Sequence, residues 1–377
     1  MTDRTSISND SKRLGNPFTP EFGKVPVYMA GRTLLIEEMV RALDSGRNDP
    51  NLCTLFVGAR GTGKTAMLSF LSNEAERLGW ISANVTSTPG MLEDIIQRLQ
   101  EAASHLIVPE SKRRIDGIEV GGILGFSWQN EGASDPNWRS RMNAVFEGLS
   151  PTDTGVLITV DEVDAGLDEL VHLVTTYQHF VREGKKVALL MAGLPHSIFT
   201  LLSGKSTSFL RRASRHDLGM LPDYEIEEAF RLTVEDGGRM VDAAAVEEAV
   251  ECIGGFPFMF QLVGYRAWNA SAGEVISLDD VRSAARLASK EMKAKIFDAT
   301  YGALSKNDRA FLNAMLESRG PATREELMQR LGKSTSHVST YKKRLLESGV
   351  IEETVVGSFV FALPGFREYL LENSSMG

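Results

Sequence analysis

The chain has 377 residues, of which 42% are hydrophobic and 24% charged, and its formal net charge is −9. These fractions match ordinary globular proteins and exclude a wholly disordered or fibrous chain. The length predicts two or three domains, because a single core seldom extends beyond about 250–300 residues. The acidic balance argues against nucleic acid coating the whole surface, but it does not exclude a local basic face.

The amino terminus, Met1 to Asn16, is polar and lacks the apolar stretch of a secretory signal. We expect a flexible tail over residues 1–22. No apolar run approaches the roughly 20 residues that a membrane span needs, so we expect a cytoplasmic protein without membrane contact. Cys53 and Cys252, the two cysteines, lie in apolar segments, so we interpret them as buried thiols and expect neither a disulfide nor a zinc site.

A glycine-rich loop follows an apolar run from Leu52 to Val57, which predicts a buried strand, and precedes a helical pattern from Ala66 to Leu78. This is the setting of a Walker A phosphate loop, in which glycines let successive amides and a helix N-terminus face one anion. The predicted nucleotide-binding residues are Gly58, Ala59, Arg60, Gly61, Thr62, Gly63, Lys64, Thr65 and Ala66. Lys64 would reach the β- and γ-phosphates, and the Thr65 hydroxyl would bind Mg²⁺.

A second apolar run, Val156 to Val160, ends in the two carboxylates Asp161 and Glu162 and is typical of Walker B. A strand that is buried on both faces opens at its carboxyl end onto the ligand side of a parallel sheet. We predict that Asp161 binds Mg²⁺ and that Glu162 orients or deprotonates the attacking water. We assign Asp164 to capping of a turn or helix.

Strands and helices alternate around these motifs, which predicts a parallel sheet with helices on both faces. The predicted strands are 52–57, 81–85, 156–160 and 187–192, and the helices between them are 66–78, 91–103 and 167–181. Residues 108–135 interrupt the alternation with a glycine-punctuated, β-rich run that predicts an inserted hairpin. The hairpin is either a surface decoration or a contact for a partner or DNA beside Lys112, Arg113 and Arg114.

Helical spacing continues through residues 226–234, 243–252 and 258–268, which predicts an all-helical subdomain. Ser277 and Asp280 then form a capping box, which predicts the start of a linker helix that runs to Tyr301. We interpret its basic stretch, residues 290–295, as a solvated face.

A different module begins at Leu304, where Ser305 with Asp308 and Thr323 with Glu326 form two more capping boxes. Gly332 predicts a left-handed helix stop before a helix over residues 334–347. Two short β-like runs, 350–355 and 359–363, follow. Three helices and a hairpin resemble a winged helix-turn-helix domain over residues 304–371.

The last helix of this module is the predicted DNA reader, because short polar groups occupy its first turns and basic groups surround them. The predicted DNA-binding residues are Lys333, Ser334, Ser336, His337, Thr340, Lys342, Lys343 and Arg344. Winged helices also dock proteins, so a protein partner is the alternative.

The motifs together resemble the AAA+ and STAND nucleotide switches, particularly the origin-recognition-like ATPases, over residues 27–272. The resemblance implies that Gly31 and Arg32 line the adenine side of the cleft and that Pro257 begins a helical lid that reports on the nucleotide. Thr33 departs from the pattern, since a glutamate often follows the glycine and arginine. The strand that ends at Met191, Ala192 and Gly193 lacks the usual polar sensor, and Phe258 stands where some relatives have an arginine, so hydrolysis is expected to be slow.

The resemblance also places an arginine finger near Arg211 and Arg212, which follow a polar loop over 203–208 and precede a strand-like run over 217–220. Such an arginine, from the same or a neighbouring subunit, stabilises charge on the transferred phosphoryl group. Paired arginines also commonly solvate a surface, and the sequence leaves both interpretations open.

The predicted architecture is an α/β P-loop AAA+ core with a parallel sheet (23–222), an all-helical lid (223–276), a linker helix (277–303) and a winged helix (304–377). The predicted function is an ATP-binding, slowly hydrolysing switch that uses ATP, ADP and Mg²⁺ and couples the nucleotide to duplex DNA. A STAND-type signalling ATPase whose winged helix binds a protein is the alternative, and self-association fits either function.

Overall fold

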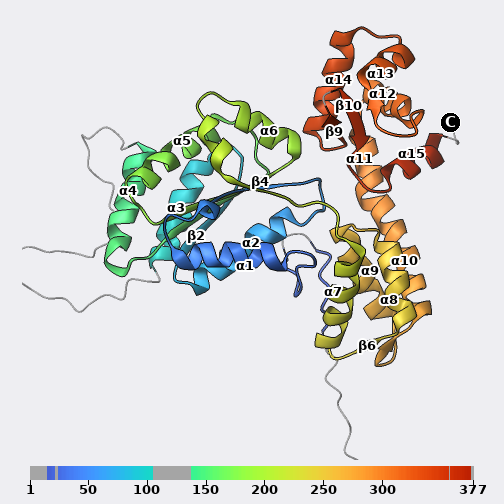
Figure 1. Cartoon of the computed structure of the whole chain (residues 1–377), viewed down its shortest axis with the longest axis horizontal. Helices are drawn as coiled ribbons and strands as arrows, with labels where there is room; N and C mark the ends of the chain where they lie inside the picture. The colour runs from blue at the N-terminus through green and yellow to red at the C-terminus, as the bar shows by residue number, and fades with distance from the viewer. Residues whose placement is uncertain (1–14, 22–23, 105–136, 356, 375–377) are drawn as a thin grey trace, which may run out of the picture. The chain divides into compact units, whose positions relative to one another are not determined.

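The computed structural model describes residues 15–21, 24–104, 137–355 and 357–374 (Figure 1). The chain divides into two compact units. The first unit consists of the chain up to Gly31 together with Leu221–Lys293. The second unit consists of Arg32–Met220 and Ala294–Gly377. The predicted insertion at 108–135 lies outside the described residues. No helix in the described part of the chain is both long and apolar enough to span a lipid bilayer.

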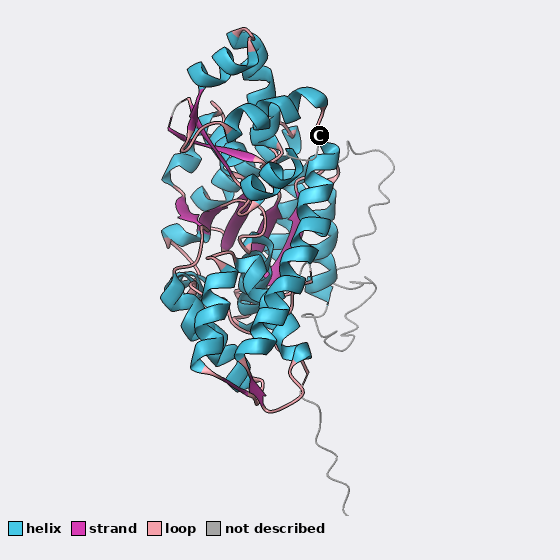
Figure 2. Ribbon diagram, turned by 90° about the vertical axis from the view of Figure 1, so that its right-hand side faces the viewer, coloured by secondary structure: helices cyan, strands magenta, loops and turns pink. Residues whose placement is uncertain are grey.

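The α/β part of the second unit contains a five-stranded parallel sheet in the order β2-β3-β4-β1-β5. The strands are β1 (Cys53–Val57), β2 (Ile81–Thr86), β3 (Val156–Asp161), β4 (Val187–Gly193) and β5 (Ser214–Asp217). The helices are α1 (Thr33–Ser45), α2 (Lys64–Arg77), α3 (Met91–Ser104), α4 (Trp138–Leu149), α5 (Asp168–Arg182) and α6 (Pro195–Ser203). Figure 2 shows the strands enclosed between helices, as predicted for a parallel sheet.

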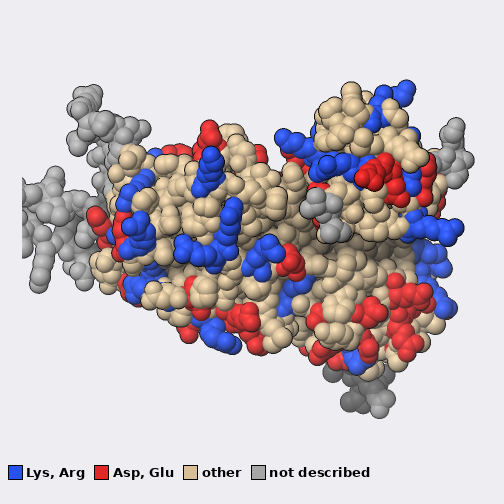
Figure 3. All heavy atoms as spheres, turned by 45° about the horizontal axis from the view of Figure 1, so that its top comes forward, with Lys and Arg blue, Asp and Glu red and all other residues tan. Residues whose placement is uncertain are grey.

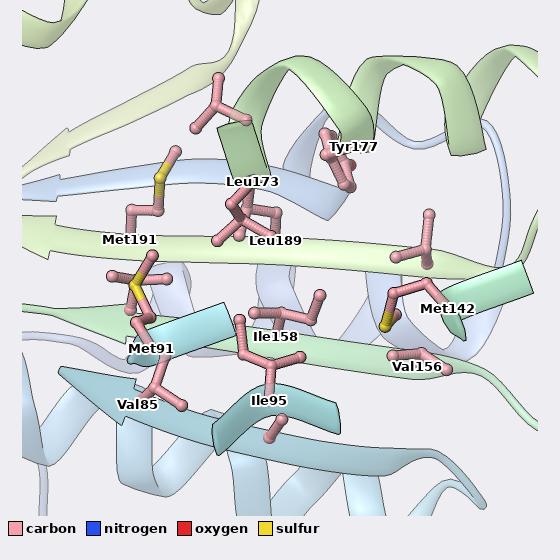
Figure 4. Packing of buried hydrophobic residues seen from close by; sticks show 14 of the residues in the cluster. Val85, Met91, Ile95, Met142, Val156, Ile158, Leu173, Tyr177, Leu189 and Met191 are labelled. Carbon is pink, nitrogen blue, oxygen red and sulfur yellow. The ribbon is translucent and has the colours of Figure 1, made fainter. Parts of the chain in front are cut away.

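One face of the sheet packs against α3, α4 and α5, and this layer holds the main hydrophobic core (Figure 4). Ile158 and Leu189 of the two central strands are fully buried there, against Ile95 of α3 and Leu173 of α5. Helix α2 lies against β2, β3 and β4 and contacts α1. The central strands are therefore covered by helices, and their carboxyl ends carry the loops of the candidate site.

The α/β part differs from the sequence expectation in β5 and in two helices, of which α4 (Trp138–Leu149) is the first. The strand expected at 217–220 is instead β5, Ser214–Asp217, preceded by a 3₁₀ turn over Ser208–Arg212. β5 lies at the edge of the sheet and pairs only with β1, so a polar sequence suffices to form it. Helix α6, which lies between β4 and the 3₁₀ turn, was also not predicted.

The helical unit contains α7 (Asp223–Asp236), α8 (Ala243–Ile253), α9 (Pro257–Ala270) and α10 (Leu278–Met292), with two short parallel strands, β6 (Met240–Val241) and β7 (Val275–Ile276). Its four helices agree with the predicted helical spacing, whereas β6 and β7 depart from the all-helical expectation. The expectation of a flexible tail over 1–22 was wrong for residues 16–19. Phe18 is 2% exposed and packs against Phe230 and Phe260, and the Thr19 amide donates to the side chain of Gln261.

A π-helical turn, Lys293–Phe297, interrupts the predicted linker helix and continues into α11 (Asp298–Ala303). The C-terminal part then contains α12 (Lys306–Leu316), α13 (Arg324–Leu331), α14 (Thr335–Glu347) and α15 (Phe366–Ser374). Its strands, β8 (Ala322–Thr323), β9 (Ile351–Val355) and β10 (Ser358–Phe361), form an antiparallel sheet in the order β8-β10-β9.

All three predicted capping boxes are present, at the starts of α10, α12 and α13. Gly332 has a φ of 59° and ends α13 in the left-handed conformation, as predicted. The order of three helices and a hairpin also agrees with the sequence, whereas β8 was not predicted. The identification of this part as a winged helix stays a prediction.

Candidate functional site

The predicted phosphate loop connects the end of β1 to the start of α2. Gly61 and Gly63 have φ angles of 80° and 87°, in the region that residues with a Cβ seldom adopt. These two glycines therefore let the chain reverse and enter α2 at Lys64. Thr62 is 5% exposed, and its hydroxyl closes the turn by donating to the carbonyl of Ala59 at 2.9 Å.

The amides of this loop form a continuous set of available donors. Within the described residues, none of the backbone N–H groups of residues 59–64 donates a hydrogen bond to the protein. Most backbone amides in folded proteins are paired, so consecutive unpaired donors at a helix N-terminus are suited to an anion with several oxygens. A triphosphate fits this donor set.

Lys64 lies beside these amides. Its ammonium group donates to the carbonyls of Gly58 at 2.9 Å and Ala59 at 2.7 Å. Burial lowers the pKa of Lys64 to about 8, and the negative charge of Asp161 partly opposes that shift. A partly desolvated ammonium gains more from an added anion than a solvated one does. The position is thus favourable for a phosphate-binding lysine.

The two predicted magnesium ligands are in direct contact. The Thr65 hydroxyl donates to the Asp161 carboxylate at 2.5 Å, across the gap between the start of α2 and the end of β3. A hydroxyl and a carboxylate oxygen at one point are the hard ligands that Mg²⁺ prefers. The structure thus brings together the side chains from the two predicted motifs, although they are 96 positions apart in the chain.

Glu162 follows in an uncommon backbone conformation. Its φ is 51°, one of three positive values outside glycine among the described residues, and its amide donates to the Asp161 carboxylate at 2.8 Å. Its side chain is exposed. Left-handed residues with a Cβ cost free energy and concentrate at functional sites. Beyond Glu162 the chain still contacts the sheet, because the Val163 amide donates to the Ala192 carbonyl of β4 at 2.9 Å.

Asp164 has the local role that the sequence predicted. Its carboxylate accepts a hydrogen bond from the amide of Gly166 at 2.9 Å and so closes a turn. The Asp164 amide donates to the hydroxyl of Ser87 at 3.1 Å, and the Ser87 amide donates to the Asp161 carbonyl at 3.0 Å. Ser87 was not singled out from the sequence, although a polar residue just after a predicted strand was the available signal.

A polar chain inside the sheet was also missed. The Thr159 hydroxyl donates to Asn84 at 2.7 Å, and the Asn84 amide donates to Ser72 at 2.9 Å, which ties β3, β2 and α2 together. The sequence signal was weak: single polar residues within otherwise apolar strands. These bonds support the side of the sheet from which α2 presents Lys64 and Thr65.

The end of β4, where the resemblance predicts no polar sensor, is tightly packed. Gly193 is buried, and a Cβ at this position would lie 3.0 Å from the Val163 Cβ and 3.1 Å from the end of Ile198. Contacts that short require the neighbours to move. A side chain at this position therefore requires small shifts of Val163 and Ile198.

The two candidate arginine fingers differ in their surroundings. Arg211 donates through Nε to the Leu202 carbonyl at 3.0 Å, whereas Arg212 has no such contact within the described residues. Both side chains are exposed at the end of the 3₁₀ turn. Arg212 is therefore the freer of the two to reach an anion.

The residues assigned to the adenine side and the lid lie in different units. Arg32 belongs to the α/β unit and donates to the Gly219 carbonyl at 2.9 Å. Gly31 and Pro257 belong to the helical unit, where Pro257 is the first residue of α9. Their roles in nucleotide binding stay predictions.

The structure divides the predicted DNA-binding cations into two groups. Lys342 pairs with Glu353 at 3.2 Å, and Arg344 binds Asp308, whose side chain is 8% exposed. Lys333 is exposed, and Lys343 is 70% exposed with only a long 3.7 Å pair to Glu347. Lys342 and Arg344 thus hold the C-terminal part together, and Lys333 and Lys343 are available to a ligand.

The polar residues at the start of α14 form a local cluster. The Ser334 hydroxyl lies 3.0 Å from the Ser336 hydroxyl and 3.0 Å from Nδ1 of His337. Thr340 donates to the carbonyl of Ser336 at 3.0 Å. All four side chains are exposed, as expected of groups that meet a partner.

Comparison with known proteins establishes the fold. A family model described as a domain of unknown function (DUF8462) matches residues 294–370. No curated protein matches the chain. A Walker-type ATPase of Pyrococcus abyssi shares 15% identity over 91% of this chain and 96% of that chain, with a TM-score of 0.59.

The ORC2 protein of Aeropyrum pernix, in its ADPNP–ADP complexes, shares 15% identity over 95% of this chain and 98% of that chain, with a TM-score of 0.58. Its ADP form gives 14% identity and a TM-score of 0.53 over the same shares of the two chains. The chain therefore shares the fold of these origin-recognition-like, Walker-type ATPases, and the predicted α/β class with a parallel sheet is confirmed.

Proposed function

We propose that the chain is an ATP-binding switch that hydrolyses ATP slowly and couples the nucleotide to duplex DNA. The observation that carries the nucleotide part is the unpaired amide set of residues 59–64, next to Lys64 and the Thr65–Asp161 contact. The solved structures of similar fold support it, since they are a Walker-type ATPase and an ORC2 protein with ADPNP and ADP.

Each residue of the site has a distinct task in this proposal. The loop amides and Lys64 hold the phosphates, and Thr65 and Asp161 hold the ion. Bound Mg²⁺ would offset phosphate charge during hydrolysis. Glu162 orients the water and accepts its proton. Arg212 adds positive charge at the transferred phosphoryl group. Arg211 could do the same if its hydrogen bond to the Leu202 carbonyl breaks.

The test of this function is nucleotide binding and turnover, measured together. Titration calorimetry with ATP and with ADP in Mg²⁺ should give saturable binding at one site per chain, and chelation of Mg²⁺ should stop phosphate release. Binding of duplex DNA should also differ between ADP and a slowly hydrolysed ATP analogue. If the chain binds no nucleotide, the proposed function is wrong.

The DNA part rests on α14 and on the cations around it. Lys333 is exposed just before α14 and next to the Ser334, Ser336 and His337 cluster, and Lys343 is exposed in the C-terminal half of the helix. This is the arrangement in which phosphate contacts fix a helix in the major groove. In Figure 3, basic and acidic atoms lie side by side on the C-terminal part, in keeping with the ion pairs of Lys342 and Arg344.

Neutralising the two available cations, Lys333→Gln with Lys343→Gln, is expected to weaken duplex binding. Each phosphate contact contributes about 0.9 to the slope of log affinity against log salt, so the slope should fall by roughly 2. The measurement is fluorescence anisotropy with labelled duplex at several salt concentrations. The matched control is Lys306→Gln with Arg319→Gln, which removes two exposed cations of the same part outside α14. Equal slopes for the two variants would place the DNA contact elsewhere.

Arg344→Ala is expected to act on stability. Burial disfavours the charged form of Asp308, but hydrogen bonds from Arg344 and Ser305 outweigh it and hold the Asp308 pKa below its usual value. Removal of Arg344 leaves this carboxylate without its cation, at a cost of about 1–3 kcal/mol. Chemical denaturation, followed by far-ultraviolet circular dichroism, should show the decrease in the free energy of unfolding. Lys343→Ala, which removes an exposed cation, is the control. Unchanged stability would mean that the Asp308 pair contributes little.

The alternative is a signalling ATPase whose C-terminal part binds a protein. One observation favours it: two of the four predicted cations, Lys342 and Arg344, are already paired with acids. A gel shift with random duplex separates the two functions. Retention that weakens steeply with salt supports DNA, whereas no retention together with a copurifying protein supports the alternative.

A further inference from the structure

A basic groove lies in the helical unit, between α8 and α10, and none of its lining residues was assigned to the nucleotide or to α14. Its volume is about 620 Å³, and it is lined by residues of α8 and α10 and by the first residue of the π-helical turn. The lining includes the cations Arg282, Arg286, Lys290 and Lys293, with Glu248 and Cys252 on the α8 side. All of these residues belong to the same compact unit.

Glu248 is the one acid among the residues that line the groove. Glu248 pairs with Arg282 at 3.0 Å. The guanidinium of Arg286 donates only to the Ser283 hydroxyl, at 3.1 Å, and Lys290 has no ion pair among the described residues. Burial, reinforced by the charge of Glu248, raises the pKa of the Cys252 thiol to about 11, so the thiol adds no negative charge at neutral pH. The groove therefore has an excess of positive charge.

This excess is not explained by the stability of the helix. Arg282, Arg286 and Lys290 are four residues apart in sequence, and like charges at that spacing destabilise an α-helix. The helix dipole favours Lys290 near the end of α10, but Arg282 and Arg286 lie in its middle. The helical unit around them is rich in acids, which Figure 3 shows as red atoms on its lower face. A ligand that needs this charge would account for the pattern.

The spacing of the cations indicates the kind of ligand. Four residues of α-helix rise about 6 Å, so the three side chains form a row roughly 12 Å long. A single small anion would use one or two of them, whereas a row suits a polymer with regularly repeated charges. Phosphates of one DNA strand follow one another every 3.4 Å along the axis, so such a row could meet about every second phosphate.

We propose that the groove between α8 and α10 is a second nucleic-acid contact, in which Arg286 and Lys290 bind phosphates of the DNA backbone. The proposal extends the DNA part of the proposed function to another unit of the chain, and it revises our interpretation of residues 290–295 as only a solvated face. Arg282, held by Glu248, keeps the row in position. The contact carries no base specificity, because phosphates are the same in every sequence.

The test is the double substitution Arg286→Gln with Lys290→Gln in the full chain. We expect the affinity for labelled duplex to fall and the salt slope to decrease by roughly 2, because two phosphate contacts are lost. The matched control is Lys24→Gln with Arg231→Gln, which removes two exposed cations from the same unit outside the groove. Thermal melting and ATP titration of both variants verify that the fold and the nucleotide site are intact.

The groove substitutions, Arg286→Gln with Lys290→Gln, are then combined with Lys333→Gln and Lys343→Gln. This combination distinguishes DNA binding by the groove from DNA binding by α14. If α14 does not bind DNA, the background variant binds like wild type, and the groove variant still weakens binding. If the groove binds only an acidic protein, or nothing, Arg286→Gln with Lys290→Gln leaves the slope unchanged. That outcome, or an intact wild-type chain that binds no duplex, overturns the proposal.

Discussion

Glu162→Gln is expected to lower the rate of ATP hydrolysis by about 10²- to 10⁴-fold, the usual contribution of a positioned general base. Glutamine has nearly the same shape and can still orient a water, but it cannot accept a proton. Nucleotide affinity should change little, because phosphates and ion are held by the loop amides, Lys64, Thr65 and Asp161. Phosphate release under single-turnover conditions, with calorimetric ATP titration of the same sample, measures both quantities.

Asp164→Asn is the matched control for this experiment. Asp164 is a nearby exposed acid whose carboxylate closes a turn onto the Gly166 amide, and asparagine can accept the same hydrogen bond. Its hydrolysis rate should remain within a few fold of wild type. If Glu162→Gln hydrolyses ATP at the normal rate, another group handles the water; if Asp164→Asn is the slower variant, we have exchanged the roles of the two acids.

The slow hydrolysis that we propose depends on the surroundings of Glu162 as well as on its chemistry. A side chain at Gly193, at the end of β4, would be tightly packed, since its Cβ would lie 3.0 Å from the Val163 Cβ. In the proposed function, hydrolysis relies on Glu162 and on Arg211 or Arg212, whose role as an arginine finger stays a prediction. A site with few catalytic groups holds its triphosphate for longer, which suits a nucleotide whose main effect is on conformation.

The α/β part was predictable from sequence because its signals are local. Strands buried on both faces have continuous apolar runs, and the phosphate loop and the acids after Val160 follow two of them directly. β5 was misplaced because an edge strand needs no such run: its residues are Ser-Arg-His-Asp, and the apolar Leu218 comes just after it. Strands of two residues, such as β8, are too short to show an alternation of apolar and polar residues.

The features that the sequence did not predict depend on contacts between distant residues. Phe18 is one aromatic residue in a polar segment, and its packing partners Phe230 and Phe260 lie more than two hundred positions away. Lys342 and Arg344 look like surface cations until the fold brings Glu353 and Asp308 next to them. The positive φ of Glu162 has no compositional signal, because glycine or asparagine would be the usual residue there.

Lys64→Ala is expected to lower ATP affinity by at least about 100-fold, and it tests the position of the phosphates directly. The ammonium group can donate to two phosphate groups, and charge-assisted hydrogen bonds contribute about 1.5–3 kcal/mol each. Two of them correspond to a loss of roughly two to four powers of ten in affinity. Calorimetry or fluorescent nucleotide displacement provides the measurement, and the melting temperature without nucleotide shows whether the fold is kept.

Arg60→Ala is the control for Lys64→Ala, because it removes a cation from the same loop whose side chain is exposed. Its effect on ATP affinity should be smaller by at least about tenfold, since an exposed charge is screened by water and salt. Lys64→Arg should recover little, because the planar guanidinium is larger and cannot replace a compact ammonium among the loop carbonyls of Gly58 and Ala59. Equal affinities for wild type and Lys64→Ala would mean that the triphosphate binds elsewhere, and Glu162 would then have no substrate beside it.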